Sequence, residues 1–485
     1  FFFDRVSFIS TSTPNPSPTH CFAHHSFPLH RHTTLLISTT RFIRLNNRSS
    51  SPISVLPMLR AVFFQFLLVA AATAFAPLAT LSPSRSGLQA QTPPRLTSGL
   101  KMSLEVAEMP KYSFPGAKEA PKILGGLKIG LRKLVVVTGA SSGLGRECAR
   151  ALVNDGKYFV VMACRDVEKG KAVAKKLNFP ENSYTVMKLE LASLKSVRDF
   201  VGNLKAFKSA RPLTHLVCNA AVYLPKDPKP TWSDDGYEMS MAVNHLGHFL
   251  LVNLLLDDMK KAKNARCVIV GSITGNSNTV GGGLVYPRAD LGKLKGMEEG
   301  GKKPIAMMDG KGYDGAKAYK DSKVMNMMTV SELHRRYHES TGITFSSMYP
   351  GCIAETQLFR EKRPWFRKIF PLFMKYVTGG YVGEQEAGER LAQVVDDPIC
   401  SKSGVYWSWN GGAGATPGSG IGRYSSDGKP RGAGGSGGEI FENVQSDAVQ
   451  DRETAKRMFD LSFDLAGMSE KEIMKPGPEP KDGLP

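Results

Sequence analysis

Tyr319 and Lys323 are the residues of this 485-residue chain best suited to proton transfer. In a helix, residues four positions apart lie one turn apart on the same face. A nearby ammonium favours the tyrosinate and lowers the pKa of the phenol from about 10, which makes the tyrosine a usable proton donor or acceptor. Because Tyr-x-x-x-Lys also occurs often by chance as a surface pair, other parts of the sequence must support this interpretation.

A glycine-rich segment earlier in the chain is suited to hold phosphate. Gly139, Gly143 and Gly145 follow an apolar run, Leu134–Val137, and precede an amphipathic helical pattern. Glycines permit a tight turn and close backbone approach, and the following helix presents free N–H groups to an anion. The segment therefore predicts a dinucleotide-binding turn rather than an ordinary strand-to-helix turn. Its other members are Ser141, Ser142 and Leu144.

A second apolar run, Tyr158–Cys164, ends at Arg165. NAD-binding proteins commonly place an acidic residue at the end of this strand, whereas an arginine suits the 2′-phosphate of NADP. Arg165, joined by Lys169, therefore favours NADPH. Asp166 lies next to Arg165 in the sequence, so a solvated charge pair is the alternative.

The elements that must position these residues alternate along the chain. Further strands are expected at Tyr184–Leu189, Leu213–Val217 and Arg266–Val270, and helices at 193–207 and 234–261. This alternation predicts an α/β fold, with a parallel sheet and helices on both faces. Such sheets bind ligands at the carboxyl ends of their strands. We expect Asn219 with Ala220, and Ser272, at that edge because each follows a strand.

Five motifs in order resemble the short-chain dehydrogenase/reductase family over roughly residues 131–410. They are Thr138-Gly-x-x-x-Gly143-x-Gly145, Asn219-Ala-Ala, Asn244, Ser272 and Tyr319-x-x-x-Lys323. The resemblance implies a single Rossmann-type doubly wound sheet, with family-specific insertions and a C-terminal helix. It also implies hydride transfer from a nicotinamide cofactor, which the Arg165 pattern identifies as NADPH.

The same resemblance implies individual roles. Tyr319 is expected to be the proton donor, Lys323 to bind the nicotinamide ribose and lower the pKa of Tyr319, and Ser272 to orient the reacting group. Asn244 would hold a water in the proton relay, while the neighbouring His245 and His248 are expected to be ordinary helix residues. Glu190, followed by Leu191, stands where the family generally has an aspartate that contacts adenine.

Three features resemble a light-driven branch of the family. Ser272 and Tyr319 are 47 residues apart, much farther than usual, and Cys352 lies in a Tyr-Pro-Gly-Cys segment after the expected sixth strand. The third feature is the aromatic and basic stretch at 360–381. This resemblance implies light-dependent reduction of the C17–C18 double bond of protochlorophyllide to chlorophyllide, in chlorophyll biosynthesis. Cys352 would then be a second proton source or an orienting group, with a buried structural cysteine as the alternative.

The aromatic and basic stretch at 360–381 has a physical interpretation of its own. Aromatic side chains offer broad contact to a flat ring system, and the cations can meet a carboxylate or anionic lipid headgroups. An amphipathic helix with a snorkelling basic face is the alternative. With the resemblance, we expect a lid over the pigment that also contacts plastid membrane lipids, and a homo-oligomer is left open.

The first 130 residues predict a targeting sequence, and the last 75 predict a flexible insertion and a C-terminal helix. Residues 1–57 are expected to be disordered upstream or leader sequence, 58–74 a signal peptide, 75–104 a plastid transit segment and 105–130 a linker. Together they resemble the bipartite leaders of algae with secondary plastids, which implies the chloroplast stroma or thylakoid surface. A membrane anchor is the alternative for 58–74. Residues 411–438, with twelve Gly, are expected to form a flexible insertion before a C-terminal helix, about Ser446–Ala466, within 439–485.

Composition excludes several classes of protein. The net charge of +19 suggests a nucleic-acid or membrane partner, but residues 1–57 contribute +4 and residues 58–130 contribute +5. No nucleic-acid-binding module accompanies the remainder, so we expect no nucleic-acid partner. Seven Cys without a Cys-x-x-Cys pair argue against a disulfide-rich module and a zinc site. A dark carbonyl reductase and a non-catalytic pigment- or membrane-binding protein remain as competing functions.

Overall fold

The computed structural model describes residues 120–276, 280–283, 285–353, 372, 380–411 and 435–478. The predictions for 1–57, 58–74 and 75–104 fall outside the described residues. So do those for residues 105–119 of the expected linker, for nearly all of the lid at 360–381 and for most of the glycine-rich stretch at 411–438.

Eight strands form one sheet in the order β3-β2-β1-β4-β5-β6-β7-β8, and all neighbours are parallel except β7 and β8. The chain moves outward from β1 to β3 and then crosses to β4 on the other side of β1, which makes the β1–β4 edge the topological switch point. The predicted doubly wound sheet is confirmed. The strands are β1 (Lys133–Thr138), β2 (Tyr158–Cys164), β3 (Tyr184–Lys188), β4 (His215–Cys218), β5 (Arg266–Val270), β6 (Thr344–Met348), β7 (Val405–Trp409) and β8 (Ile440–Asn443).

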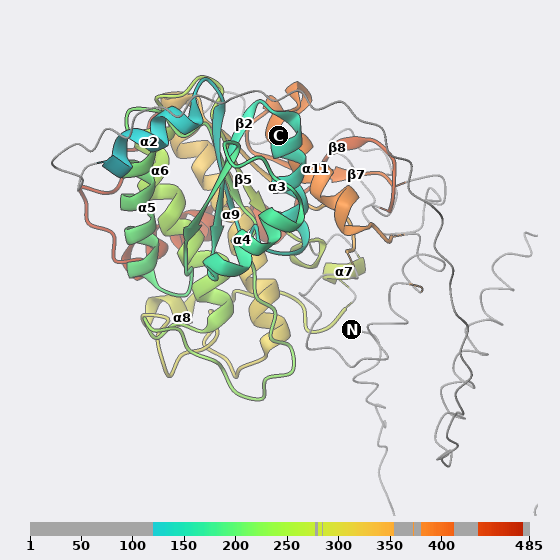
Figure 1. The fold of residues 1–485 in the computed structure, drawn as a ribbon. Coiled ribbons are helices and arrows are strands. Elements are labelled where there is room, and N and C mark those ends of the chain that lie inside the picture. The colour runs from blue at the N-terminus through green and yellow to red at the C-terminus, as the bar shows by residue number, and fades with distance from the viewer. Residues whose placement is uncertain are drawn as a thin grey trace, which may run out of the picture. The chain divides into compact units, whose positions relative to one another are not determined.

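Helices cover both faces of the sheet (Figure 1). Side chains of α5, α6, α9 and α13 join the core on one face, and those of α3, α4 and α11 join the core on the other. The α-helices are α2 (Ala120–Ile129), α3 (Gly143–Asp155), α4 (Val167–Lys176), α5 (Leu194–Lys208), α6 (Gly247–Met259), α7 (Val280–Gly283), α8 (Lys295–Glu298), α9 (Gly315–Thr341), α11 (Glu384–Asp396), α12 (Asp447–Gln450) and α13 (Arg452–Leu465). Shorter elements are the π-helix η1 (Met241–Leu246) and the 3-10 turns η2 (Ile273–Gly275) and η5 (Pro398–Ser401).

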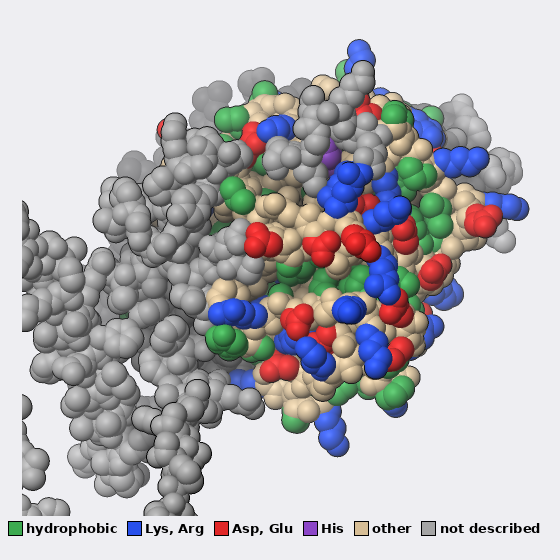
Figure 2. All heavy atoms as spheres, turned by 180° about the vertical axis from the view of Figure 1, so that it is seen from behind, with side chains coloured by type: hydrophobic (Ala, Val, Ile, Leu, Met, Phe, Trp, Pro, Cys, Tyr) green, Lys and Arg blue, Asp and Glu red, His purple; other side chains and the backbone are tan. Residues whose placement is uncertain are grey.

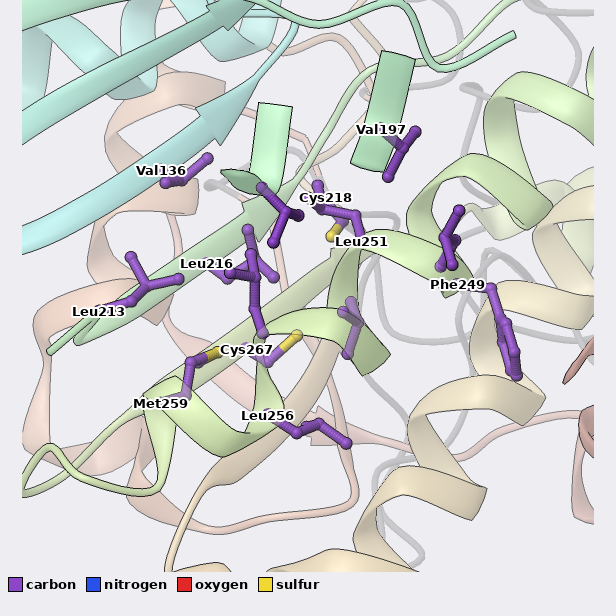
Figure 3. Close-up of a cluster of buried hydrophobic side chains, with 14 of the residues drawn as sticks. Val136, Val197, Leu213, Leu216, Cys218, Phe249, Leu251, Leu256, Met259 and Cys267 are labelled. Carbon is purple, nitrogen blue, oxygen red and sulfur yellow. The ribbon is translucent and has the colours of Figure 1, made fainter. Parts of the chain in front are cut away.

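The central strands are apolar on both faces because both faces are covered. In β1, Leu134 and Val136 point into one core while Val135 and Val137 point into the other. Such two-sided burial produces continuous apolar runs, which is why the sequence located β1 and β2 well. Figure 3 shows the first of these cores, where Val136 lies near side chains of the neighbouring strand and of α6.

Three helical segments differ from the expectation because tertiary contacts override local pattern. Residues 120–129, expected to be part of a linker, form α2, although Gly125 and Gly126 lie inside it. A β-carbon at Gly125 would lie 2.1 Å from the backbone oxygen of Phe207, so α2 packs closely against the end of α5. Glycine weakens an isolated helix, and this contact supplies the missing stabilisation.

The expected helix at 234–261 begins later than the apolar pattern suggests. Glu238 pairs with Trp232 in an isolated bridge, and the chain then enters the π-helix η1 before α6 begins at Gly247. The final helix is likewise divided at Asp451 into α12 and α13. Strands β7 and β8 had no counterpart in the prediction.

The surface carries charges of both signs. Figure 2 shows Lys and Arg interspersed with Asp and Glu over the face seen from behind. Interspersed charges of this kind are typical of a solvated surface. Within the part of the chain that the structure describes, none of the helices has the length and apolar character needed to span a bilayer.

Helices α3 and α11 provide a test of the packing. A β-carbon at Gly388 of α11 would lie 2.2 Å from Cβ of Glu147 and 2.6 Å from its carbonyl carbon. Gly388→Ala should therefore lower the free energy of unfolding by about 1–3 kcal/mol through overpacking. Gly202→Ala, in α5, is the control, because a β-carbon there meets nothing within 4 Å. It should stabilise the protein by about 0.5–1 kcal/mol. Equal effects in urea unfolding would contradict this packing.

Candidate active site

The carboxyl ends of the parallel strands bring the predicted residues to one edge of the sheet. Parallel strands share a direction, so the segments that follow them emerge at the same edge. Six predicted site residues lie just after successive strands: Gly139 after β1, Arg165 after β2, Glu190 after β3, Asn219 after β4, Ser272 after β5 and Cys352 after β6.

The turn after β1 has the tight geometry that glycine permits. Gly139 and Gly143 have φ of 69° and 52°, in the left-handed region. A β-carbon at Gly145 would lie 2.4 Å from Nδ2 of Asn219 and 2.7 Å from the backbone oxygen of Gly139. The Asn219 side-chain amide donates to the backbone oxygen of Thr138 at 2.9 Å, which fixes the residue that precedes the turn.

The start of α3 fits a pyrophosphate group. Ser142 is the N-cap residue in extended conformation, and its side chain makes no capping hydrogen bond. The first-turn N–H groups, including those of Leu144 and Gly145, therefore have no side-chain cap, and the helix dipole favours an anion there. Ser141 forms a hydrogen bond with the Cys164 side chain at the end of β2. This turn and helix start are the residues that would hold the phosphates of NADPH.

The adenosine end of the expected cofactor site is more open. Nε of Arg165 lies 3.8 Å from Oε2 of Glu190, and the Arg165 side chain is 73% exposed. The other Glu190 oxygen accepts from the Ala192 N–H at 3.1 Å. Lys169 is exposed at the start of α4, whereas the Leu191 side chain is buried in the core, so Leu191 can offer only its backbone.

A hydrogen-bond network joins this turn to the catalytic side. The Thr138 hydroxyl accepts from the N–H groups of Asn219 and Ala220 at 2.9 and 3.0 Å. Its own hydrogen points to Nε2 of His248, 2.9 Å away, because Nδ1 of His248 donates to the Asn244 carbonyl at 3.1 Å. Burial lowers the pKa of His248 to about 4, so the ring is neutral at pH 7. His248, expected to be an ordinary helix residue, is thus a link between the two halves of the site.

Tyr319 and Lys323 lie together on the buried face of α9, as the spacing predicted. Nζ of Lys323 lies 5.8 Å from the centre of the Tyr319 ring and donates to the Val270 carbonyl at 2.8 Å. Ser272, two residues beyond Val270, forms a hydrogen bond with Tyr319. The three groups expected to carry the proton chemistry are therefore adjacent.

In this structure the pKa of Tyr319 is shifted upward rather than downward. Burial raises the pKa of Tyr319 to about 12, and the hydrogen bond with Ser272 offsets only part of that rise. Lys323 does not lower the pKa of the phenol here, since its ammonium points to the Val270 carbonyl, and burial lowers the pKa of Lys323 itself to about 8. Tyr319 holds its proton at pH 7, as it would at its ordinary pKa near 10, and the raised pKa makes it a donor rather than a base.

The Asn244 side chain is hydrogen-bonded to two neighbouring segments. Its side-chain oxygen accepts from the Val222 N–H at 2.8 Å, and its amide donates to the Val222 carbonyl and to the Ser322 hydroxyl, both at 3.0 Å. Ser322 in turn donates to the Tyr319 carbonyl at 2.6 Å. The Asn244 side chain is therefore a brace between the segment after β4 and the catalytic helix.

Sequence reasoning missed Tyr223. Its ring centre lies 4.8 Å from that of Tyr319, at an angle of 56°, and only 3% of the residue is exposed. Tyr223 follows β4 by five positions and sits next to the Val222 backbone that Asn244 holds. One aromatic residue in a loop is no sequence signal, so only the fold could identify this contact.

Cys352 lies at the site edge in a short backbone pairing. Its N–H donates to the Gly380 carbonyl at 3.3 Å, and its carbonyl accepts from the Val382 N–H at 3.1 Å. Burial raises the pKa of the Cys352 thiol to about 12, so the thiol is neutral at pH 7. Burial also raises the pKa of Tyr349, and the nearby Cys352 and Tyr319 raise it further.

The face of α9 that carries Lys320 and Asp321 contacts the insertion, which is the long stretch between Ser272 and Tyr319. Lys320 donates to the carbonyls of Val285 and Pro287, each at 2.6 Å. Lys317 pairs with Asp321 at 2.6 Å, and Asp321 accepts from the Asp290 N–H at 2.8 Å. The residues interleaved with the Tyr-Lys pair therefore hold the insertion to the catalytic helix, a function that the spacing alone did not reveal.

Glu238 and Asp321 line a small cavity behind α9, together with methionines including Met241 and Met325. Burial is the main cause that raises the pKa of both carboxyls to about 7. For Glu238 the folded pKa exceeds its ordinary value of 4.5, so folding binds a proton between these two pH values. The stability from neutral Glu238 is thus fully present below pH 4.5 and is lost as the pH rises through 7.

Glu238→Gln should remove this loss, because glutamine stays neutral and still accepts from the Met241 N–H. The variant and the natural protein should be about equally stable near pH 4.5, and the variant should be more stable by up to about 3 kcal/mol at pH 8. Asp321 contributes equally to the pH dependence of stability in both proteins. Urea unfolding at several pH values measures the difference, and parallel pH profiles for the two proteins would rule the assignment out.

The comparisons with known proteins agree with this geometry. The family model for short chain dehydrogenases matches residues 133–289. Protochlorophyllide reductase, chloroplastic, of Chlamydomonas reinhardtii is 52% identical over 340 residues, which are 70% of this chain and 79% of that protein. The carrot (Daucus carota) protein of the same name is 51% identical over 339 residues, covering 69% of this chain and 78% of that protein. Protochlorophyllide reductase A, chloroplastic, of Arabidopsis thaliana is 52% identical over 339 residues, covering 69% and 77%. The chain therefore belongs to the protochlorophyllide reductases, within the short-chain dehydrogenases.

Proposed function

We propose that this chain is a light-dependent NADPH:protochlorophyllide oxidoreductase of the plastid, which reduces the C17–C18 double bond of protochlorophyllide to give chlorophyllide. The observation that carries the proposal is a buried, protonated Tyr319 beside Lys323 and Ser272. This arrangement occurs in a chain about half identical to proteins named protochlorophyllide reductase. Relatives named as chloroplastic support the plastid location and a part in chlorophyll biosynthesis.

NADPH supplies the hydride for this reduction. The turn at Gly139–Gly145 and the start of α3 would hold its phosphates, and Asn219 and Ala220 border the same turn. We assign the 2′-phosphate to Arg165 and Lys169, because both are exposed cations, Arg165 directly after β2 and Lys169 in the first turn of α4. Glu190 competes for Arg165, but at 3.8 Å between an exposed arginine and a half-buried glutamate that pair is weak.

Tyr319 gives the proton. Once a hydride has added to one carbon of the double bond, the other carbon carries the electron pair and forms a bond to the Tyr319 hydroxyl hydrogen. The O–H bond breaks, and its electrons stay on the phenolate. A phenol whose pKa is raised to about 12 keeps its proton until such a strongly basic carbon develops. Lys323, whose Nζ is 5.8 Å from the ring centre and donates to the Val270 carbonyl, is assigned to the nicotinamide ribose.

We assign the pigment contacts to Cys352 and to the stretch that follows it. Cys352 would contact the pigment as an orienting group, since its thiol is neutral at pH 7 and lies at the site edge. The aromatic and basic stretch at 360–381 would cover the flat ring system and touch anionic plastid lipids. Assembly into a homo-oligomer and delivery by a bipartite leader belong to the same proposal.

The decisive experiment compares darkness with light. The chain is mixed with NADPH and protochlorophyllide, and absorbance is recorded before and after a flash. We expect no conversion in darkness and a red shift to a chlorophyllide band after the flash. Conversion in darkness would instead indicate a dark reductase, and binding without conversion would indicate a non-catalytic pigment-binding protein.

Tyr319→Phe tests the proton donor. The ring packing against Tyr223 is retained while the hydroxyl is lost, so proton transfer should slow by about 10²-fold or more. NADPH binding should stay unchanged, as followed by fluorescence titration. Tyr223→Phe is the matched control and should slow the reaction far less. A Tyr319→Phe protein with the natural rate after the flash would remove Tyr319 from the donor role.

A further inference from the structure

Arg390 is a buried arginine in α11, only 4% exposed, and it lies outside the residues assigned to the site. Its Nη1 donates to the Pro350 carbonyl at 2.7 Å. Pro350 stands two residues before Cys352 and directly after Tyr349. The guanidinium therefore holds the chain at the point where it leaves β6 for the segment proposed to meet the pigment.

The other arm of the guanidinium reaches a different part of the chain. Nη2 of Arg390 lies 2.7 Å from the carbonyls of Gly435 and Gly437 and 2.8 Å from Oε1 of Glu386. Glu386 also accepts from the Gly437 N–H at 2.6 Å and from the Ser436 hydroxyl. One planar group thus fastens residues 435–437, which lead into β8, to the start of the Cys352 segment.

The backbone geometry at Gly351 makes the position of the Cys352 side chain sensitive to the hydrogen bond between Arg390 and the Pro350 carbonyl. Gly351, between Pro350 and Cys352, has φ of 108°, in the region that favours glycine. The Arg390 guanidinium also lies 5.1 Å from the centre of the Trp409 ring, which limits its movement. Since the arginine holds the Pro350 carbonyl and only Gly351 separates it from Cys352, the position of Cys352 depends on the arginine as well as on its backbone pairing with Gly380 and Val382.

We infer that Arg390 is a positioning residue for the pigment-binding side of the site: it sets the Tyr349–Cys352 segment relative to Tyr319. The inference rests on the proposed function. A lysine would keep the charge but cannot span both arms, because its ammonium is a single point without the planar fork of arginine. The NADPH turn, after β1, makes none of the Arg390 contacts.

Arg266 offers a matched control. It is also a buried arginine, 8% exposed, and its Nη1 donates to the carbonyls of Val394 and Asp397 at 3.1 and 2.8 Å. It is the first residue of β5, so it lies at the amino end of the strands, opposite the site edge. A merely structural arginine should behave like Arg266.

The first measurement compares Arg390→Lys with Arg266→Lys in the full chain. Both variants should lose stability in urea unfolding. Only Arg390→Lys should bind protochlorophyllide about tenfold or more weakly in darkness, as one charged hydrogen bond predicts, and yield less product per flash. NADPH affinity should stay within about twofold for both. Equal losses of pigment affinity in the two variants would overturn the inference.

The second measurement needs no pigment. Cys352 is half-buried, whereas Cys148, Cys164, Cys218, Cys267 and Cys400 are buried. The rate of Cys352 alkylation by iodoacetamide, followed by peptide mass spectrometry, should rise severalfold in Arg390→Lys and stay unchanged in Arg266→Lys. An unchanged rate in folded Arg390→Lys would contradict the positioning role.

The two measurements separate the inference from the proposed function. If the natural chain fails to convert pigment after a flash, the proposed function fails while the alkylation result still decides whether Arg390 positions Cys352. If Arg390→Lys does not fold, Glu386→Gln replaces it, because it leaves Arg390 in place and weakens the arm toward residues 435–437. That variant should change alkylation and pigment affinity in the same direction by a smaller factor, and no change in either would overturn the inference.

Discussion

The burial of α9 is the constraint on which the site depends. A polar group removed from water must find a partner, or the fold loses several kcal/mol. Most of this helix is buried, including residues as polar as Lys320, Asp321 and Lys323, and Lys317 is half-buried. Lys323 donates a hydrogen bond to a carbonyl of β5, and Lys320 donates to a carbonyl of the insertion. Lys317 and Asp321 form an ion pair with each other.

The chemistry follows from the same burial. Removal from water raises the pKa of Tyr319 and lowers that of Lys323, so the phenol stays protonated while the ammonium becomes easier to deprotonate. The partners of the helix also join the two halves of the site. Ser322 and Asn244 connect α9 to the segment after β4, and His248 continues that connection to Thr138 below the glycine turn. Proton donor and cofactor turn are therefore parts of one hydrogen-bonded structure.

Prediction from sequence succeeded where a pattern has one physical explanation. Strand β2 has the predicted bounds and β1 differs by one residue at each end, because strands buried on both faces read as unbroken apolar runs. The glycine turn was recognisable because only glycine tolerates its backbone angles and close contacts. Prediction from sequence failed for α2, for the π-helix η1 and for β7 and β8, because their conformations depend on partners distant in the chain. Tyr223, Lys320 and Arg390 were missed for the same reason, since each acts through a contact that no local pattern records.

Short-range patterns in the sequence were enough to establish the α/β class, the positions along the chain of the strands that carry the site, and the Tyr319–Lys323 pair. Each of these is written in local periodicity or in short spacing, which act over a few residues. Tertiary contacts were needed to establish that the pKa of Tyr319 is raised, that Asn244 braces two segments and that the insertion is attached to α9. These depend on desolvation and on hydrogen bonds between segments tens of residues apart, and such contacts exist only after the chain has folded.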